Sequence, residues 1–310
     1  MSARTASNAP APRPARRRPH EGSLTHPRRT GLLLVLPAVV LVVVFVFVPL
    51  LSAGYISLTS FPLIGSYEFI GLENFALAFN DPIFLRSILY TFVYTAIVTG
   101  PILALGYALA VIVRSNRRGS TLLRTVFFLP FVVGLTTISF ITLLEAQPRS
   151  GAINIVLRAL GITDGTTAWL VNGPLATLLI CVLVIWGVSG LTMILLMSAM
   201  QGVPREVYES AELDGASWWQ TERQVTIPMI RRAIAMSVII SVIGSFLAFT
   251  QFYILTQGGP GSETTTVVMA IYRRAFVDLQ LGAATAMSLL LVLLTALVTA
   301  IQFWMLRERD

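Results

Sequence analysis

Long stretches without a charged residue divide the chain into apolar segments. A helix needs roughly 20 apolar residues to cross lipid, because its backbone must satisfy its own hydrogen bonds there. Each charge-free segment is long enough for one such helix, and the segments are 30–67, 87–113, 125–144, 165–204, 233–262 and 279–306. The pattern predicts an all-α, polytopic membrane protein with six transmembrane helices, at about 31–54, 87–113, 122–145, 175–200, 233–256 and 282–305.

Two of these segments allow a second interpretation. The segment 165–204 is long enough for two spans, but its first part is polar loop (Gly165, Thr166, Thr167, Asn172, Gly173 and Pro174), which favours one helix. The first segment could instead be a cleaved signal sequence. The apolar region of a signal is about 7–15 residues long, and this run is longer, so we expect a retained helix.

The distribution of arginine predicts the orientation, because cytoplasmic loops of membrane proteins carry an excess of basic residues. The tail, loop 114–124, loop 201–232 and the C-terminus together carry most of the 22 basic residues. The opposite side has only Arg86, Arg149, Arg158, Arg273 and Arg274. The chain is therefore predicted to be a multi-pass protein of the cell (plasma or inner) membrane with both termini in the cytoplasm.

Composition supports lipid as the main solvent. Hydrophobic residues make up 55% of the chain and charged residues 12%, whereas soluble domains carry about 25% charged residues. The net charge of +7 is concentrated in residues 1–30, where prolines are also frequent. This segment is predicted to be a disordered basic cytoplasmic tail, and 31–310 the transmembrane domain. A basic flank beside the lipid bilayer is favoured over a nucleic-acid-binding arm.

Several kinds of chemistry are excluded by missing residue types. The chain has no lysine, which a phosphate-binding loop requires, so any nucleotide hydrolysis must take place on another chain. Cys181 is the single cysteine and cannot form an intrachain disulfide, and His20 and His26 both lie in the tail. We therefore expect no enzyme activity and no metal or other cofactor in this chain.

The predicted spans carry no acid or base at their centres. Ionisable residues inside a membrane usually mark proton relays, ion pathways or voltage sensors. Their absence argues against a proton-coupled carrier or an ion channel, and suits a neutral polar substrate or energy supplied from outside the membrane. A secondary transporter and a non-transporting membrane scaffold remain the alternatives at this point.

The loop 201–232, between the fourth and fifth spans, has a legible local chemistry. Pro204 suits the first turn of a helix, and Gly215 permits the left-handed conformation that ends one. Ser217 and Gln220 form a capping-box pattern that begins a second helix. The loop is predicted to form a short helix, a sharp turn and another helix on the cytoplasmic face.

An interfacial amphipathic helix is the alternative for this loop. Interfacial helices favour Arg and Lys on their polar face, whereas this loop carries five acids, Glu206, Glu209, Glu212, Asp214 and Glu222. An acidic helix exposed to the cytoplasm is better suited to a basic groove on a partner protein.

The same loop resembles the EAA loop of binding-protein-dependent ABC permeases. The family pattern is Glu-Ala-Ala, three residues, Gly, nine residues, then Ile-x-Leu-Pro. Here Glu209-Ser210-Ala211, Gly215 and Val225-Thr226-Ile227-Pro228 fall on that spacing. Ser210, Val225 and Ile227 depart mildly from the pattern, and the Asp214-Gly215-Ala216 core is intact.

Other segments look like those of carbohydrate-uptake permeases, namely Gly71-Leu-Glu-Asn-Phe75, Trp169-Leu170, Leu255-Thr-Gln-Gly-Gly-Pro260 and Ile271-Tyr272. Within that group the chain resembles the first of the two permeases, of the maltose and glycerol-phosphate transporter type. The resemblance implies a type I ABC importer permease fold that moves a carbohydrate by alternating access. It also implies a homologous second permease, an ATPase subunit dimer that holds ATP and Mg, and an extracytoplasmic solute-binding protein.

The resemblance further implies which residues couple the permease to its ATPase, because in this family the EAA helix sits in a cleft of that subunit. Carried over to this chain, they are Glu209, Ser210, Ala211, Asp214, Gly215, Ala216 and Pro228.

Sugars are usually held by aromatic faces and neutral hydrogen-bonding groups, and related permeases line their cavity with the fourth and fifth spans. The candidate substrate-pathway residues are Trp186, Ser189, Ser245, Phe249, Gln251, Phe252 and Tyr253. Small residues such as serine also serve helix packing, and Phe252 and Tyr253 could belong to an interfacial aromatic belt. Both interpretations remain open.

Overall fold

A computed structural model describes residues 28–62, 65–115 and 119–306 of the chain. The predicted disordered tail, 1–30, lies outside the described residues except for 28–30, which are helical. The chain divides into two compact units, Met1–Leu50 and Leu51–Asp310. No strand is present in the described ranges, where isolated bridges join Thr59 to Phe69 and Pro62 to Gln280.

The described part of the first unit, from residue 28 onward, is an apolar helical segment. It contains α1 (Arg28–Val42), a π-helical turn η1 (Val43–Phe47) and the start of α2 (Val48–Ile56). Side chains from Leu32 to Leu50 are exposed. Leu32–Ile56 is long and apolar enough to cross a membrane, in agreement with the predicted first span.

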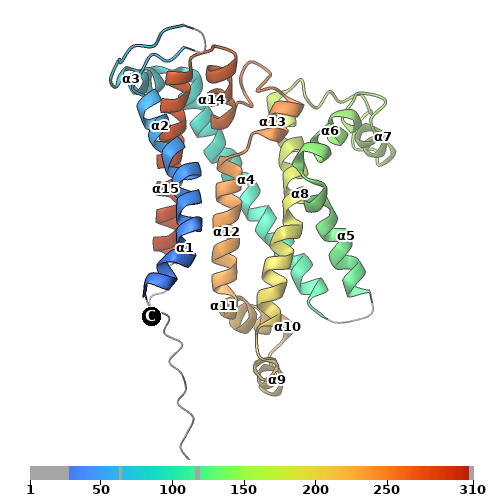
Figure 1. Ribbon diagram of the computed structural model, residues 1–310. Coiled ribbons are helices and arrows are strands. Elements are labelled where there is room, and N and C mark those ends of the chain that lie inside the picture. Colours follow the sequence, from blue (N-terminus) through green and yellow to red (C-terminus); the bar gives the residue numbers. More distant parts are fainter. Residues whose placement is uncertain (1–27, 63–64, 116–118, 307–310) are drawn as a thin grey trace, which may run out of the picture. The chain divides into compact units, whose positions relative to one another are not determined.

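The second unit contains the remaining helices of the described chain (Figure 1). On its way through the bundle the chain forms α3 (Glu73–Asn80), α4 (Pro82–Val113), α5 (Ser120–Val133), α6 (Leu135–Glu145), α7 (Ala152–Ala159) and α8 (Gly173–Gln201). It continues with α9 (Arg205–Leu213), α10 (Trp218–Thr221), η2 (Glu222–Thr226), α11 (Ile227–Met229), α12 (Arg231–Phe246), α13 (Thr250–Leu255), α14 (Val267–Phe276) and α15 (Leu281–Leu306).

The long helices begin where the sequence provides capping groups. The Asp81 carboxylate accepts hydrogen bonds from the backbone N–H groups of Ile83 and Phe84 at 2.8 and 3.2 Å, and Pro82 occupies the first turn of α4. Asn172 caps α8 in the same way, accepting from the N–H of Leu175 at 3.2 Å. Both caps satisfy backbone donors that have no partner within the helix.

The third span differs from its prediction as one helix over 122–145. The chain breaks at Gly134, which has a φ of +84°, and α5 and α6 meet there at a bend of 88°. A positive φ is accessible to glycine without the steric cost that other residues meet. Five other helical stretches in the described chain are long and apolar enough to span a membrane, and the bent pair makes a sixth when counted as one span. The predicted number of spans is confirmed on that basis.

The remaining predicted spans can also be compared with the observed helices. Residues 173–201 form the single helix α8, so the two-span alternative for 165–204 is excluded. The predicted fifth span, 233–256, is interrupted: α12 ends at Phe246 and α13 begins at Thr250. The helices α4 and α15 match the predicted second and sixth spans, although α4 starts earlier, at Pro82.

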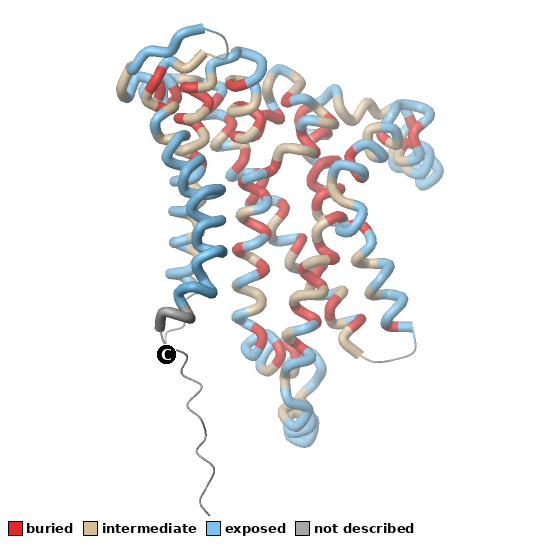
Figure 2. The backbone as a smooth tube through the Cα atoms, in the orientation of Figure 1, coloured by how far each residue is buried: buried red, intermediate tan, exposed pale blue. Residues whose placement is uncertain are grey.

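The core runs along α4 and α8 (Figure 2). One buried cluster joins these two helices to α6 and α13, and includes Tyr94, Ile180 and Phe252. A second joins α4 to α3, α12, α14 and α15, and a third joins the other end of α4 to α8 and α12. Because α4 takes part in all three clusters, it connects the two ends of the bundle.

Candidate functional site

The loop between α8 and α12 folds as predicted into a short helix, a sharp turn and a second helix. Pro204 lies immediately before α9, and Glu206 occupies its first turn, where a negative charge interacts favourably with the positive end of the helix dipole. Neither α9 nor α10 has a buried residue. They lie at the end of the bundle opposite α13 and α14 (Figure 1).

Gly215 makes the turn that ends α9. Its φ is +74°, and its N–H donates to the carbonyl of Glu212 at 3.0 Å. The next N–H, of Ala216, reaches back to the carbonyl of Ala211 at 3.0 Å. Ser217 then begins α10 with the predicted capping box, its N–H donating to Oε1 of Gln220 at 2.7 Å. The local sequence therefore determines how α9 is presented.

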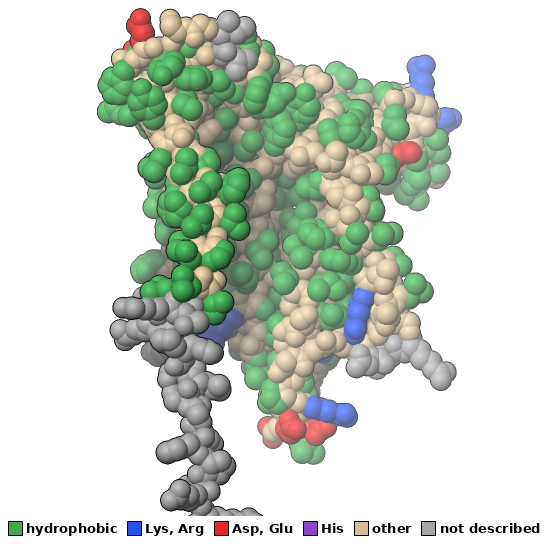
Figure 3. Space-filling model, in the orientation of Figure 1, with side chains coloured by type: hydrophobic (Ala, Val, Ile, Leu, Met, Phe, Trp, Pro, Cys, Tyr) green, Lys and Arg blue, Asp and Glu red, His purple; other side chains and the backbone are tan. Residues whose placement is uncertain are grey.

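The tip formed by α9 is acidic and open to solvent (Figure 3). Glu209 pairs with Arg205 one turn earlier at 2.9 Å, and the two side chains are 58% and 88% exposed. Such exposed pairs contribute little to stability, about 0–1 kcal/mol. Of the predicted coupling residues, Ala211 and Ala216 are partly buried, and the exposed ones are Glu209, Ser210, Asp214, Gly215 and Pro228. Their coupling role stays a prediction.

One part of the acidic-surface prediction is wrong. Glu222 was grouped with four acids of the exposed helix, but its residue is only 2% exposed. Its carboxylate accepts hydrogen bonds from Tyr107 of α4 and from Arg114, the residue that directly follows this helix. Buried charges are normally paired in this way. The sequence placed Glu222 on the surface because its neighbours are polar, and its partners are more than 100 residues away along the chain.

The fourth span contributes two of the predicted pathway residues to one groove. This groove of about 490 Å³ lies among α4, α5, α6 and α8, and both Trp186 and Ser189 line it. Trp186 is 55% exposed, whereas Ser189 is buried and donates its hydroxyl to the carbonyl of Ile185 in its own helix. The other lining side chains are almost all apolar.

The fifth-span candidates separate into two sets. Ser245, Gln251 and Phe252 are buried. Gln251 Nε2 lies 3.3 Å from the hydroxyl of Tyr94 on α4 and donates to it, and the Phe252 ring meets the Tyr94 ring edge-on at 5.0 Å between centroids. These contacts attach α13 to α4.

Phe249 and Tyr253 form the second set, in a more open cluster of rings. Their rings stack at 5.2 Å, and each also contacts Tyr272 of α14, which in turn contacts Phe276. Tyr272 donates a hydrogen bond to the Tyr253 hydroxyl, and this bond raises the pKa of Tyr272 above its ordinary value. The sequence analysis did not assign Tyr272 or Phe276 to this site. The i, i+4 spacing of aromatic residues in both helices was the available signal.

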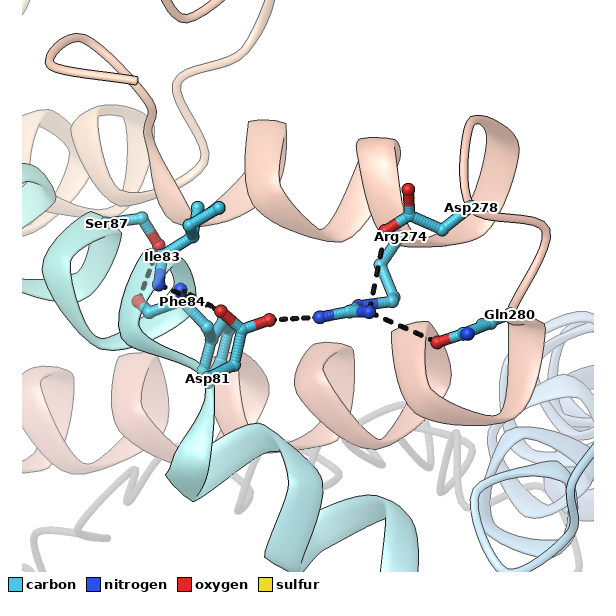
Figure 4. A network of polar contacts seen from close by, with 7 residues as sticks. All are labelled: Asp81, Ile83, Phe84, Ser87, Arg274, Asp278 and Gln280. Carbon is cyan, nitrogen blue, oxygen red and sulfur yellow. Dashed lines mark hydrogen bonds and ion pairs between the residues drawn. The ribbon is translucent and has the colours of Figure 1, made fainter. Parts of the chain in front are cut away.

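At the same end of the bundle, an ion pair holds α14 to the start of α4 (Figure 4). Asp81, the cap of α4, also pairs through its second oxygen with Arg274 of α14. Arg274 contacts Gln280 at 3.2 Å and Asp278 at 3.5 Å as well. One carboxylate thus caps the membrane helix α4 and pairs with the short helix α14. Within the described ranges, no group of His, Cys, Asp and Glu could hold a metal ion.

Comparison with known proteins identifies the family to which this chain belongs. Residues 102–309 match the family described as binding-protein-dependent transport system inner membrane component. A diacetylchitobiose uptake system permease of Streptomyces coelicolor is 32% identical over 97% of this chain and 89% of its own length. The chain belongs to this family of transport permeases.

Other relatives and solved structures agree with the family. The lactose transport system permease of Rhizobium radiobacter is 31% identical to this permease, over 90% of this chain and 94% of its own. A bacterial ABC transporter involved in the import of the acidic polysaccharide alginate has the same fold, with a TM-score of 0.80 at 20% identity, over 91% of this chain and 97% of its own. A second structure of that kind, in complex with an alginate pentasaccharide-bound periplasmic protein, has a TM-score of 0.79 at 21% identity, over 90% and 95% of the two chains.

The region that matches the family model, residues 102–309, contains the α9 turn, the buried Glu222 and the aromatic cluster on α13 and α14. The expected type I importer fold is confirmed, and the permease is a multi-pass membrane protein.

Proposed function

We propose that this permease, together with a homologous second permease, forms the passage of an ATP-driven importer that moves a carbohydrate into the cytoplasm by alternating access. Relatives named for diacetylchitobiose and lactose, each at least 30% identical, support the substrate class. The long apolar spans without a charge at their centres support a neutral solute.

The observation that carries this proposal is the exposed acidic helix α9. The four acids on or just after it, Glu206, Glu209, Glu212 and Asp214, are all exposed, and Gly215 holds the turn that follows. Leu213 is 89% exposed beside them, so this acidic surface also carries an apolar side chain. A basic, partly apolar groove on an ATPase subunit would complement this surface.

Arginine distribution supports a cytoplasmic position for α9 and for both termini. The ATPase dimer would then hold ATP and Mg, since this chain has no lysine for a phosphate-binding loop. An extracytoplasmic solute-binding protein would deliver the carbohydrate at the other end of the bundle. This permease would itself carry no enzyme activity.

The direct test is transport by the reconstituted complex. The permease is purified with its co-encoded ATPase and second permease, placed in liposomes, and supplied with the binding protein and a radiolabelled oligosaccharide. Uptake that requires ATP on the ATPase side is the expected result. Uptake driven by a proton gradient without ATP would instead establish a secondary transporter, and no association with an ATPase would indicate a scaffold.

Two substitutions test the coupling helix. Glu209→Lys reverses a charge that could bind a basic groove, and charge-assisted hydrogen bonds contribute about 1.5–3 kcal/mol. ATPase association should weaken about ten- to hundredfold on the scale of 1.4 kcal/mol per decade. Gly215→Val should abolish coupled uptake, because a β-branched residue is strained at a φ of +74°.

The control for the second substitution is Gly215→Asn. No atom lies within 4 Å of the position that a Cβ would take at Gly215, so both replacements have room. Asparagine tolerates the left-handed conformation far better than valine, and it should retain most of the coupled transport. Normal transport by both Glu209→Lys and Gly215→Val would show that α9 is only an interfacial anchor.

A further inference from the structure

The segment that follows the α9 turn is attached to the bundle by a buried carboxylate. Neither α9 nor α10 buries a side chain. Glu222 begins the π-helical turn η2 and is 2% exposed, although it is charged. A buried acid requires partners of matching chemistry, and α4 provides them.

Both oxygens of Glu222 are occupied. Its Oε1 accepts from Nη2 of Arg114 at 2.6 Å, and its Oε2 accepts from the Tyr107 hydroxyl at 2.6 Å. Tyr107 and Arg114 are seven residues apart, which places them two turns apart on the same face of a helix. The carboxylate is therefore held at two points along the axis of α4.

Arg114 also reaches α9 itself. Its guanidinium carbon lies 5.7 Å from the centre of the Tyr208 ring, a cation–π distance. The Tyr208 hydroxyl is 3.5 Å from Oγ1 of the buried Thr226 in η2. Arg114 thus contacts both Glu222 of η2 and the Tyr208 ring of α9. Through these side chains the end of α4, α9 and η2 are connected to one another.

At its other end, α4 contacts α13. Arg114 directly follows the 32-residue helix α4 as its C-terminal cap, and Tyr94 lies nearer the start of that helix. Tyr94 accepts the hydrogen bond from Gln251 and contacts Phe252. A displacement of α4 along its length would therefore reach two of the predicted pathway residues through a single continuous helix.

We propose that Glu222, Arg114 and Tyr107 are positioning residues that transmit displacement of α9 to α4. This inference rests on the proposed function, in which an ATPase subunit moves α9. A paired, doubly held carboxylate resists both sliding and rotation of η2 against α4, because either motion leaves a buried charge without its partner. The exposed pair of Arg205 and Glu209, which lies within α9 alone, cannot do this.

The test compares substitutions in the complete reconstituted importer. Glu222→Gln keeps the shape of the side chain but removes its charge, and Tyr107→Phe removes one hydrogen bond. Arg274→Gln removes an ion pair at the opposite end of α4 and serves as the control. ATPase retention, ATP hydrolysis, carbohydrate transported per ATP and the midpoint of thermal unfolding are measured for each.

Glu222→Gln should retain the ATPase and continue to hydrolyse ATP, while carbohydrate transported per ATP falls about ten- to hundredfold. Tyr107→Phe should show a smaller loss, of about two- to tenfold. Arg274→Gln should keep the wild-type ratio even where its unfolding midpoint falls. A wild-type ratio in Glu222→Gln overturns the proposal, as does an equal loss of the ratio in Arg274→Gln.

A second variant tests the proposal if Glu222→Gln prevents the complex from assembling. Where Glu222→Gln yields no complex, the double substitution Arg114→Gln with Glu222→Gln leaves no unpaired buried charge. It should assemble and show the same loss of transport per ATP, and a wild-type ratio overturns the proposal. If the wild-type complex itself imports no carbohydrate with ATP, the proposed function has failed. If it does so and Glu222→Gln does equally well, only the positioning role has failed.

Discussion

The sharpest stability prediction concerns Gly190, where α8 meets α5. A Cβ at this position would lie 2.5 Å from the carbonyl oxygen of Phe127 and 3.0 Å from Cα of Phe128. Both atoms belong to the backbone of α5, so a change of rotamer cannot relieve the contact. Gly190→Ala must therefore separate the two helices or distort one of them. Overpacking of this kind costs about 1–3 kcal/mol.

Two glycines provide matched controls for the same substitution. At Gly187, on the same helix, a Cβ would meet only side-chain methyl groups, Cδ2 of Leu135 at 3.3 Å and Cδ1 of Ile138 at 3.5 Å. These groups can shift by a few tenths of an ångström. At Gly244 in α12 nothing lies within 4 Å, and alanine there should stabilise the helix by about 0.5–1 kcal/mol.

The assay is the thermal unfolding midpoint of the three purified variants under one set of detergent conditions. We expect Gly244→Ala to unfold at or above the wild-type temperature, Gly187→Ala close to it, and Gly190→Ala clearly below it. Equal midpoints for Gly190→Ala and Gly187→Ala would refute the reasoning, because they would mean that the α5 backbone moves away from α8 without cost.

Two further predictions concern topology and the pathway. Single cysteines introduced into 146–174, with Cys181 replaced, should react with an impermeant thiol reagent added outside intact cells, whereas cysteines in 201–232 should not; labelling of the latter would overturn the predicted orientation. Gln251→Ala should impair carbohydrate uptake while the complex still assembles, and Tyr94→Phe, which keeps the ring but removes the acceptor, should reproduce part of the defect. Unchanged uptake in both would assign Gln251 to packing.

The apolar pattern was sufficient to predict the spans, because a membrane helix is specified by length and lack of charge rather than by distant contacts. The turn after α9 was equally predictable, since Gly215 and the Ser217 capping box act on their immediate neighbours. The break at Gly134 was not predictable in this way. Its neighbours are apolar on both sides, so the apolar pattern continues through the position at which the chain bends by 88°.

The position of Glu222 shows a second limit of local reasoning. Its neighbours in the sequence are polar, so the pattern places it on a solvated helix. In the structure Glu222 lies in the π-helical turn η2 and faces α4, where Tyr107 donates a hydrogen bond to it and Arg114 forms an ion pair with it. The burial of Glu222 depends on partners more than 100 positions away in the sequence, and no local motif indicates such a pairing.

The arrangement of α13 constrains how the predicted pathway residues can act. Phe249 and Tyr253 are four residues apart and share one side, toward Tyr272, whereas Gln251 and Phe252 face Tyr94 of α4. A helix cannot present both sides to one passage, so in this conformation the two sets must have different roles. We predict that the open ring cluster contacts the sugar through its aromatic faces, whereas the buried pair attaches α13 to α4. Substitution of the first set should therefore change which carbohydrates are transported, whereas substitution of the second should change the amount transported per ATP.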